Sequence, residues 1–349
     1  MMKRLGITLS VTLLLAAVQT VYADESQDID RARDALTKQD SDADTEKALE
    51  QVFEAAEKNY SLLEKGGMSL NYNFDYTYYG DQRIDLEIVP SGTSSVIRNA
   101  DVSPVASHSF TNSFAFDYGL ANNITLGFRL PLVAKFETQD ELSGYGIGDI
   151  SSTVRFQPSE YIPGKASRTY FGSLRMPTGV SPYEINENES LPTGGGTFGL
   201  SGGISTSKVL DPVVLFGSLS GSYSLPATGL KQARGDQELQ EVNNGAGVSF
   251  SMGFAYSLSY DISLSASFQG SYSHESEFVL YRPSTGQETR QKTSSQMSGI
   301  MNFALGVRVS PKTIANVNVG FGMTELSPDI ILGLSLPIDI EGAKPSEGS

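Results

Sequence analysis

The sequence predicts an all-β transmembrane barrel of about twelve antiparallel strands, with an N-terminal α-helical segment before it. Three observations favour this fold. Segments of roughly ten residues alternate apolar and polar side chains from Met68 onward. Short turns and long polar stretches alternate between these segments. An export signal precedes them, and no later run reaches the roughly 20 apolar residues that a membrane-spanning helix needs.

The first 23 residues have the features of a signal peptide. Lys3 and Arg4 are basic, residues 5–18 are mostly apolar, and residues 21–23 end in a small-residue cleavage site at Ala23. We therefore expect the mature chain to leave the cytoplasm. A closed barrel is the other structure that satisfies its own backbone in a bilayer, so the expected location is the bacterial outer membrane.

Residues 24–66 are expected to form a separate periplasmic or plug segment. One face of an amphipathic helix is predicted from the three- and four-residue spacing of Leu49, Val52, Phe53, Ala56, Tyr60 and Leu63. A helix of about twenty residues needs a surface to cover such a stripe. Another copy of the chain, the barrel lumen and a periplasmic partner remain open as that surface. The barrel itself is expected at 67–340, with a tail at 341–349.

Strand alternation defines the outward face of each predicted strand. In the first strand, at 68–78, Leu70, Phe74 and Tyr78 point one way and Asn73 and Asp75 the other. The remaining outward faces are centred on Phe114, Phe128, Val154, Tyr170, Leu200, Leu215, Phe250, Leu264, Phe303, Val317 and Leu332.

The connections between these strands support the same count. Tight turns are expected at 119–123, 209–212, 257–261 and 310–313, with a longer one at 157–167. Long polar loops are expected at 79–106, 137–146, 178–196, 226–242 and 274–294. Short turns on the periplasmic side and long loops outside are typical of outer-membrane barrels, and an even strand number puts both ends in the periplasm.

Charged residues fall on the inward positions of several strands. Because charges facing lipid are costly near the membrane centre, these side chains are expected to line a water-filled pore: Asp75, Asp117, Arg129, Lys135, Asp149, Arg155, Arg175 and Arg308. One interpretation is that the arginines set the selectivity for ions or substrates. The other is that they pair with Asp117 and Asp149 and brace the wall.

Composition excludes several other functions. The net charge of −15 argues against a nucleic-acid partner. The absence of Cys and the two scattered histidines leave no metal-ligand spacing, and we expect no cofactor. The glycines at 144, 146 and 148 precede a strand rather than a helix, so they do not indicate a nucleotide loop.

An enzymatic alternative is carried by His274 and Ser276. A His and a Ser two residues apart on one strand face resemble the outer-membrane phospholipase, which is also a twelve-stranded barrel. The Asn and Gly that follow the Ser in that family are replaced here by Glu277 and Phe278. We therefore expect a protein that is not an enzyme, with hydrolysis as a second alternative.

Four stretches resemble one family: 57–66, 68–79, 208–214 and 310–313. They are similar to outer-membrane proteins of the meta-pathway phenol-degradation transporter superfamily, and within it to the functional-amyloid secretion channel. The resemblance implies a homotrimer held by a coiled coil at 26–38, a plug helix at 45–65, and export of an unfolded amyloid-type polypeptide. Other members are thought to take up small aromatic compounds, so a small solute is the alternative cargo. Membrane lipid is the remaining expected partner.

Overall fold

The computed structural model describes residues 62–91, 94–138, 141–159, 162, 164–186, 189–259, 261–310 and 313–338, with side chains described outside 81–105. The regular elements of this part of the chain are all β-strands. None of its segments is a helix long and apolar enough to cross a membrane. The predicted signal peptide at 1–23, the predicted coiled coil and most of the predicted plug helix lie outside these residues, as does the predicted tail.

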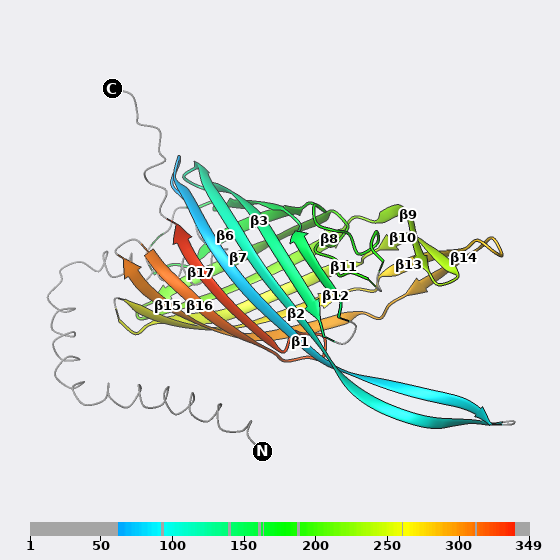
Figure 1. The fold of residues 1–349 in the computed structure, drawn as a ribbon. Coiled ribbons are helices and arrows are strands. Elements are labelled where there is room, and N and C mark those ends of the chain that lie inside the picture. The colour runs from blue at the N-terminus through cyan, green and yellow to red at the C-terminus, as the bar shows by residue number, and fades with distance from the viewer. Residues whose placement is uncertain are drawn as a thin grey trace, which may run out of the picture. The chain divides into compact units, whose positions relative to one another are not determined.

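One large antiparallel sheet closes into a barrel (Figure 1). The sheet has thirteen strands, but β4 (Ser143–Ile147) and β5 (Ser151–Phe156) lie end to end along β3, so the wall has twelve strand positions. The other wall strands are β1 (Met68–Ser91), β2 (Ser94–Ala121), β3 (Ile124–Glu137), β6 (Ser167–Arg175), β7 (Gly199–Leu210), β8 (Val213–Ser224), β11 (Ala246–Ser257), β12 (Ile262–Ser273), β15 (Gln296–Ser310), β16 (Thr313–Gly322) and β17 (Ile330–Ile338). Pairing of β1 with β17 joins the first strand to the last. The predicted twelve-stranded barrel is confirmed.

The predicted loop at 79–106 is wrong, because β1 and β2 remain paired as far as Ser91 and Ser94. They form a ribbon that extends past the barrel rim (Figure 1), with one register shift between Glu87 and Ile88. Apolar alternation weakens after Tyr78, but the backbone pairing continues without it. The side-chain pattern therefore ended the predicted strand too early.

The predicted loops at 226–242 and 274–294 are also wrong in part. They contain a second, four-stranded sheet of β9 (Ala227–Arg234), β10 (Gln237–Asn243), β13 (Glu277–Arg282) and β14 (Gln287–Lys292). Leu239 and Val242 pack with Tyr183 in its small core. β14 is exposed along its whole length, so it has no apolar face from which a strand is recognised.

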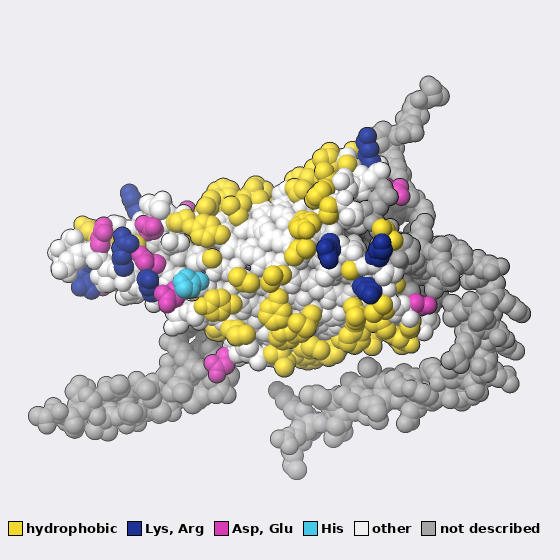
Figure 2. Space-filling model, turned by 180° about the vertical axis from the view of Figure 1, so that it is seen from behind, with side chains coloured by type: hydrophobic (Ala, Val, Ile, Leu, Met, Phe, Trp, Pro, Cys, Tyr) yellow, Lys and Arg dark blue, Asp and Glu magenta, His cyan; other side chains and the backbone are white. Residues whose placement is uncertain are grey.

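The outer wall carries the apolar side chains that alternation predicted (Figure 2). Although apolar, they are exposed on the wall of the isolated chain, including Phe114, Phe128, Leu130, Val154, Leu174, Leu200, Leu215, Phe254, Leu264, Phe303, Val317 and Leu332. An exposed apolar surface of this extent requires a non-aqueous environment. Together with the closed hydrogen-bonded wall, it is the lipid-facing belt of a transmembrane barrel.

The two rims of the barrel differ in the length of their connections. Asn122–Asn123, Asp211–Pro212 and the turn after β11 are short and lie at one end, where β1 begins and β17 ends. The second sheet, the β1–β2 ribbon and the connection from β6 to β7 lie at the other end. By the usual arrangement in outer-membrane barrels, the short-turn end faces the periplasm.

Candidate functional site: the barrel lumen

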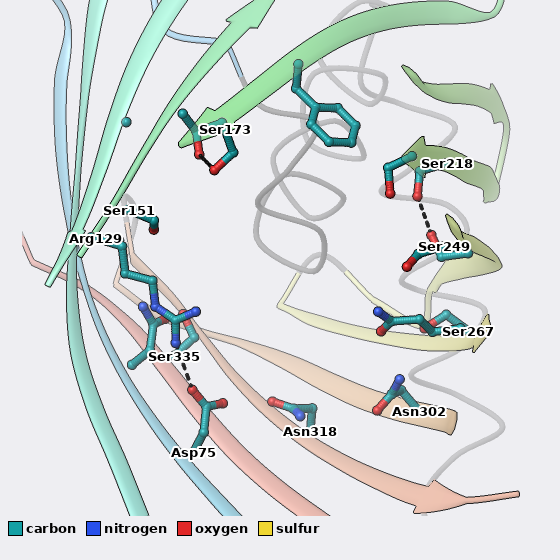
Figure 3. Close-up of a pocket in the computed structure, with 18 of the residues that line it drawn as sticks. Asp75, Arg129, Ser151, Ser173, Ser218, Ser249, Ser267, Asn302, Asn318 and Ser335 are labelled. Atoms are coloured by element: carbon teal, nitrogen blue, oxygen red, sulfur yellow. Dashed lines mark hydrogen bonds and ion pairs between the residues drawn. The ribbon is translucent and has the colours of Figure 1, made fainter. Parts of the chain in front are cut away.

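A cavity of about 700 Å³ lies inside the barrel (Figure 3). Alternation places small polar side chains on the inner wall, because the outward positions of the same strands hold the apolar belt. Hydroxyl and amide groups dominate the lining: Asn73, Ser151, Thr153, Ser173, Ser201, Ser218, Ser220, Ser249, Ser251, Ser265, Ser267, Gln269, Asn302, Asn316, Asn318 and Ser335. The lumen therefore offers a hydrogen-bonding surface to a water-soluble ligand.

Charged groups occupy only one side of this cavity within the described residues. Asp75, Asp117, Arg129 and Arg155 come from the neighbouring strands β1, β2, β3 and β5. The lining contributed by β7 to β17 carries no charged side chain in the described part of the chain. A solute in the cavity thus contacts paired charges on one wall and neutral hydroxyl and amide groups on the other.

Arg129 is the most accessible cation of the charged wall. Its guanidinium lies 3.5 Å from the carboxylate of Asp75, and its Nε donates a 3.1 Å hydrogen bond to Ser113 (Figure 3). The Arg129 and Asp75 side chains are 49% and 38% exposed. Both groups remain available to a passing ion, because a surface pair of this kind is weak and well hydrated.

Arg155 and Asp117 form a tighter pair deeper in the wall. Nη1 of Arg155 donates a 2.8 Å hydrogen bond to Oδ1 of Asp117, and the two side chains are 11% and 17% exposed. They come from β5 and β2, so the contact passes over β3 between them. Gly127 of β3 makes room for it, since a Cβ there would lie 2.5 Å from Oδ1 of Asp117.

The remaining predicted pore residues do not line the described cavity. Asp149 is 3.7 Å from Arg175 and also accepts backbone hydrogen bonds from Gly179 and Gly195, at 3.2 and 2.8 Å. It thereby holds the 176–198 connection against the wall. Lys135 is an inward residue of β3 near the long-loop end.

Arg308 lies near the short-turn end, 3.9 Å from Asp261 and with only 6% of its side chain exposed. Sequence reasoning placed Asp261 in a tight turn and missed it as a partner of Arg308. Each of the four predicted arginines therefore lies near a carboxylate, but only Arg155 and Arg175 meet the expected partners, Asp117 and Asp149. Of these four arginines, only Arg129 both pairs with a carboxylate and has a substantially exposed side chain in the cavity.

The chain enters the barrel wall from its inner side. The backbone N–H of Leu63 donates a 2.9 Å hydrogen bond to Oγ1 of Thr125, an inward residue of β3 that is fully buried. A Cβ on Gly119 would collide with the carbonyl oxygen of Glu64. Residues 62–65 are not helical, so the predicted helix does not extend to Lys65. Leu49, Val52, Phe53, Ala56 and Tyr60 lie outside the described residues.

An apolar patch faces inward near the same end. Val214, Phe216 and Ala255 are 2%, 5% and 2% exposed and form one cluster, against which Val209 packs. They occupy the inward positions of β7, β8 and β11, where most neighbouring positions hold Ser or Thr. Sequence reasoning missed this patch, although the run Val213–Val214–Leu215–Phe216 is apolar on both faces of the strand.

The geometry at His274 does not assemble a nucleophile and base. His274 directly follows the barrel strand β12 and its side chain is exposed, while the Ser276 backbone pairs with Thr293. Among the described residues, no hydrogen bond joins the His274 imidazole to the Ser276 hydroxyl. The described part of the chain likewise contains no group of His, Asp and Glu side chains arranged to hold a metal ion.

No family model matches the chain. Its fold is similar to the crystal structure of an outer-membrane channel from Pseudomonas putida F1, with a TM-score of 0.56 and 13% identity over 80% of this chain and 98% of that one. The translocator domain of the autotransporter NalP from Neisseria meningitidis follows, with a TM-score of 0.45 and 10% identity over 85% of this chain and 98% of that one. The chain shares the barrel fold of the Pseudomonas putida channel, and such a barrel with its lipid-facing belt places the protein in the bacterial outer membrane.

Proposed function

We propose that the barrel is a channel for small polar solutes, and that the segment before β1 closes its periplasmic mouth. The cavity of about 700 Å³ with its hydroxyl and amide lining carries the first part. A ligand of modest size exchanges its hydration shell for these groups without a large loss of hydrogen bonding. Polar and charged side chains outnumber apolar ones in the lining, although Phe171 also faces the cavity, and this balance favours polar solutes over aromatic ones.

The gating part of the proposal rests on where the described chain begins. Leu63 is bound to the inner wall through Thr125, so the described chain begins on the lumen side of the rim. The inward patch of Val214, Phe216 and Ala255 provides an apolar surface in a lumen lined mostly by hydroxyl and amide groups. The predicted stripe of Leu49, Val52, Phe53, Ala56 and Tyr60 supplies a complementary apolar surface.

Two finer expectations remain proposals without support from the site. Among the described residues, the lumen lining has no feature that favours an unfolded amyloid-type polypeptide over a small solute. A homotrimer through residues 24–66 depends on residues that the structure does not describe.

Single-channel conductance in a planar bilayer tests both parts of the proposal. We expect the mature protein to be mostly closed and a variant lacking residues 24–61 to be steadily open. The deletion retains residues 62–67, so the contacts of Leu63 and Gly66 with the rim are kept. Equal conductance of the two proteins would contradict gating, and no conductance from either would contradict the channel itself.

Solute preference is tested by swelling of vesicles that contain the truncated protein. Uncharged sugars and small amino acids should enter faster than aromatic acids of similar size. The opposite order would favour an aromatic substrate.

A further inference from the structure

Three basic side chains gather on the outer wall at the short-turn end of the barrel. Arg168 at the start of β6 and Lys208 near the end of β7 occupy outward positions, and both are exposed. Lys165 is exposed in the turn that leads into β6. Figure 2 shows basic side chains gathered near one end of the face that it presents. Such a group stands out in a chain with a net charge of −15.

Arg168 and Lys208 are diagonal neighbours, Lys165 lies three residues before Arg168, and none of the three is neutralised by a described carboxylate. Arg168 pairs in register with Thr206, and Lys208 lies two residues farther along the same face of β7. Diagonal neighbours of this kind are about 7–8 Å apart, a spacing that two long side chains bridge around one phosphate group. Within the described residues none of the three forms an ion pair, and the exposed Asp211 in the following turn pairs with none of them.

The position of this basic patch along the barrel matches a membrane interface. Tyr170 is the next outward residue after Arg168 on β6 and is 45% exposed. Exposed leucines of the apolar belt follow on the same faces, at Leu174 and Leu200. Aromatic residues beside cations at the edge of an apolar belt lie at the level of lipid headgroups. Because the basic patch lies at the short-turn end, which faces the periplasm, the headgroups at this level belong to the periplasmic leaflet.

A row of glycines crosses the belt just above Tyr170. Gly172, Gly202 and Gly221 are register partners on β6, β7 and β8, and all three are outward and exposed. A Cβ on them would meet nothing nearer than 4.0, 3.5 and 3.9 Å, so the packing of the barrel does not require glycine there. Their absent side chains leave bare backbone between the exposed Leu174, Leu200 and Leu219.

We propose that Lys165, Arg168 and Lys208 bind the headgroup of an anionic phospholipid of the periplasmic leaflet, with an acyl chain lying over the glycine row. Cations of this kind attract anionic headgroups at a membrane surface. Continuity of the basic patch with the lipid-facing belt favours a phospholipid over a free phosphate ion. A second copy of the chain docked through the same face would bring like charges together.

The test is native mass spectrometry of the full mature protein, released from detergent after addition of phosphatidylglycerol or phosphatidylethanolamine. In the variant that combines Lys165→Gln, Arg168→Gln and Lys208→Gln, retention of phosphatidylglycerol should fall about tenfold or more, with little change for phosphatidylethanolamine. A control variant combines Lys231→Gln, Arg290→Gln and Lys292→Gln in the second sheet. It removes the same charge away from the belt and should retain phosphatidylglycerol like the wild type.

Heat-dependent migration in gels shows whether each variant is a folded barrel, so that loss of binding is not confused with loss of fold. Unchanged retention in the first variant, or an equal loss in the control variant, would overturn the proposal.

A Gly202→Leu variant tests the acyl chain separately. It should lower the retention of phosphatidylglycerol several-fold but leave competition by soluble glycerophosphate unchanged. If glycerophosphate displaces the lipid completely from the wild type, the site holds only a headgroup and the acyl part fails. If Gly202→Leu instead dissociates an oligomer while lipid retention is unchanged, the face is a contact between copies and the proposal is wrong.

Discussion

Arg155 reaches across an entire strand to Asp117, at 2.8 Å, and the contact passes over a glycine. Neither side chain belongs to a strand next to the other's, since β3 lies between β5 and β2. The pair therefore ties three neighbouring strands of the wall together from inside. Its low exposure sets it apart from the Arg129–Asp75 pair in the same cavity.

Neutralising one member of this pair should destabilise the barrel. Asp117→Asn or Arg155→Gln leaves a partly buried charge without its partner, and we expect each to lower the free energy of unfolding by about 1–3 kcal/mol. Urea unfolding in lipid vesicles measures this. The double variant should lose less than the sum of the two single variants, because the two residues act as one unit. Strict additivity would show that the pair contributes nothing as a pair.

Gly127→Ala should weaken the same contact without removing a charge. The added Cβ would lie 2.5 Å from Oδ1 of Asp117, so the carboxylate has to move. We expect a loss of about 1–3 kcal/mol in the free energy of unfolding. Gly172→Ala on the outer wall is the matched control, because its Cβ would meet nothing nearer than 4.0 Å. A similar loss in both variants would show that the effect comes from the backbone rather than from Asp117.

Arg129 and Asp75 should shift the ion selectivity of the open channel in opposite directions. Arg129→Gln leaves an exposed carboxylate and favours cations, whereas Asp75→Asn leaves an exposed guanidinium and favours anions. A single charge at about 4 Å in water is worth about 1 kcal/mol, so the permeability ratio should change by at most about fivefold. Reversal potentials in a salt gradient measure the ratio. Arg290→Gln, outside the barrel, should leave it unchanged.

Thr125→Val should loosen the rim contact of the chain that precedes β1. The substitution keeps the shape of a fully buried side chain but removes the acceptor for the Leu63 N–H. A hydrogen bond of this kind contributes about 0.5–1.5 kcal/mol, so the open fraction of the channel should rise by about two- to tenfold. Single-channel recording gives this fraction. Thr153→Val, which loses only a contact with Ser173 in the wall, is the control and should open no more than the wild type.

Alternation was enough to predict the barrel because its two faces meet different solvents. The lipid-facing side of β3 carries Phe128, Leu130 and Leu132, and the lumen-facing side carries the polar residues Thr125 and Arg129. Where both faces meet water, this signal disappears. β14, with the sequence Gln287–Glu288–Thr289–Arg290–Gln291–Lys292, was therefore missed.

Sequence reasoning named inward charges, and Asp117 and Asp149 as possible partners, but it did not assign each arginine to a carboxylate. Sequence spacing alone does not show that Arg155 passes β3 to reach Asp117, because that depends on strand register and on the space left by Gly127. The outward glycines were missed for a related reason. Only the register of three strands shows that Gly172, Gly202 and Gly221 form one row.

The pairing of β1 with β17 also constrains how the protein is made. Nine register pairs, from Leu70 with Ile338 to Tyr78 with Ile330, join the earliest strand to the latest. The wall cannot seal until the ribosome has finished the last strand, so the growing chain must be kept from aggregating throughout its synthesis and passage across the periplasm. A chain truncated before β17 would leave the edges of β1 and β16 unpaired. Unpaired backbone N–H and C=O groups at a strand edge are unfavourable in a bilayer. Closure of the barrel therefore depends on β17 being present to pair with β1.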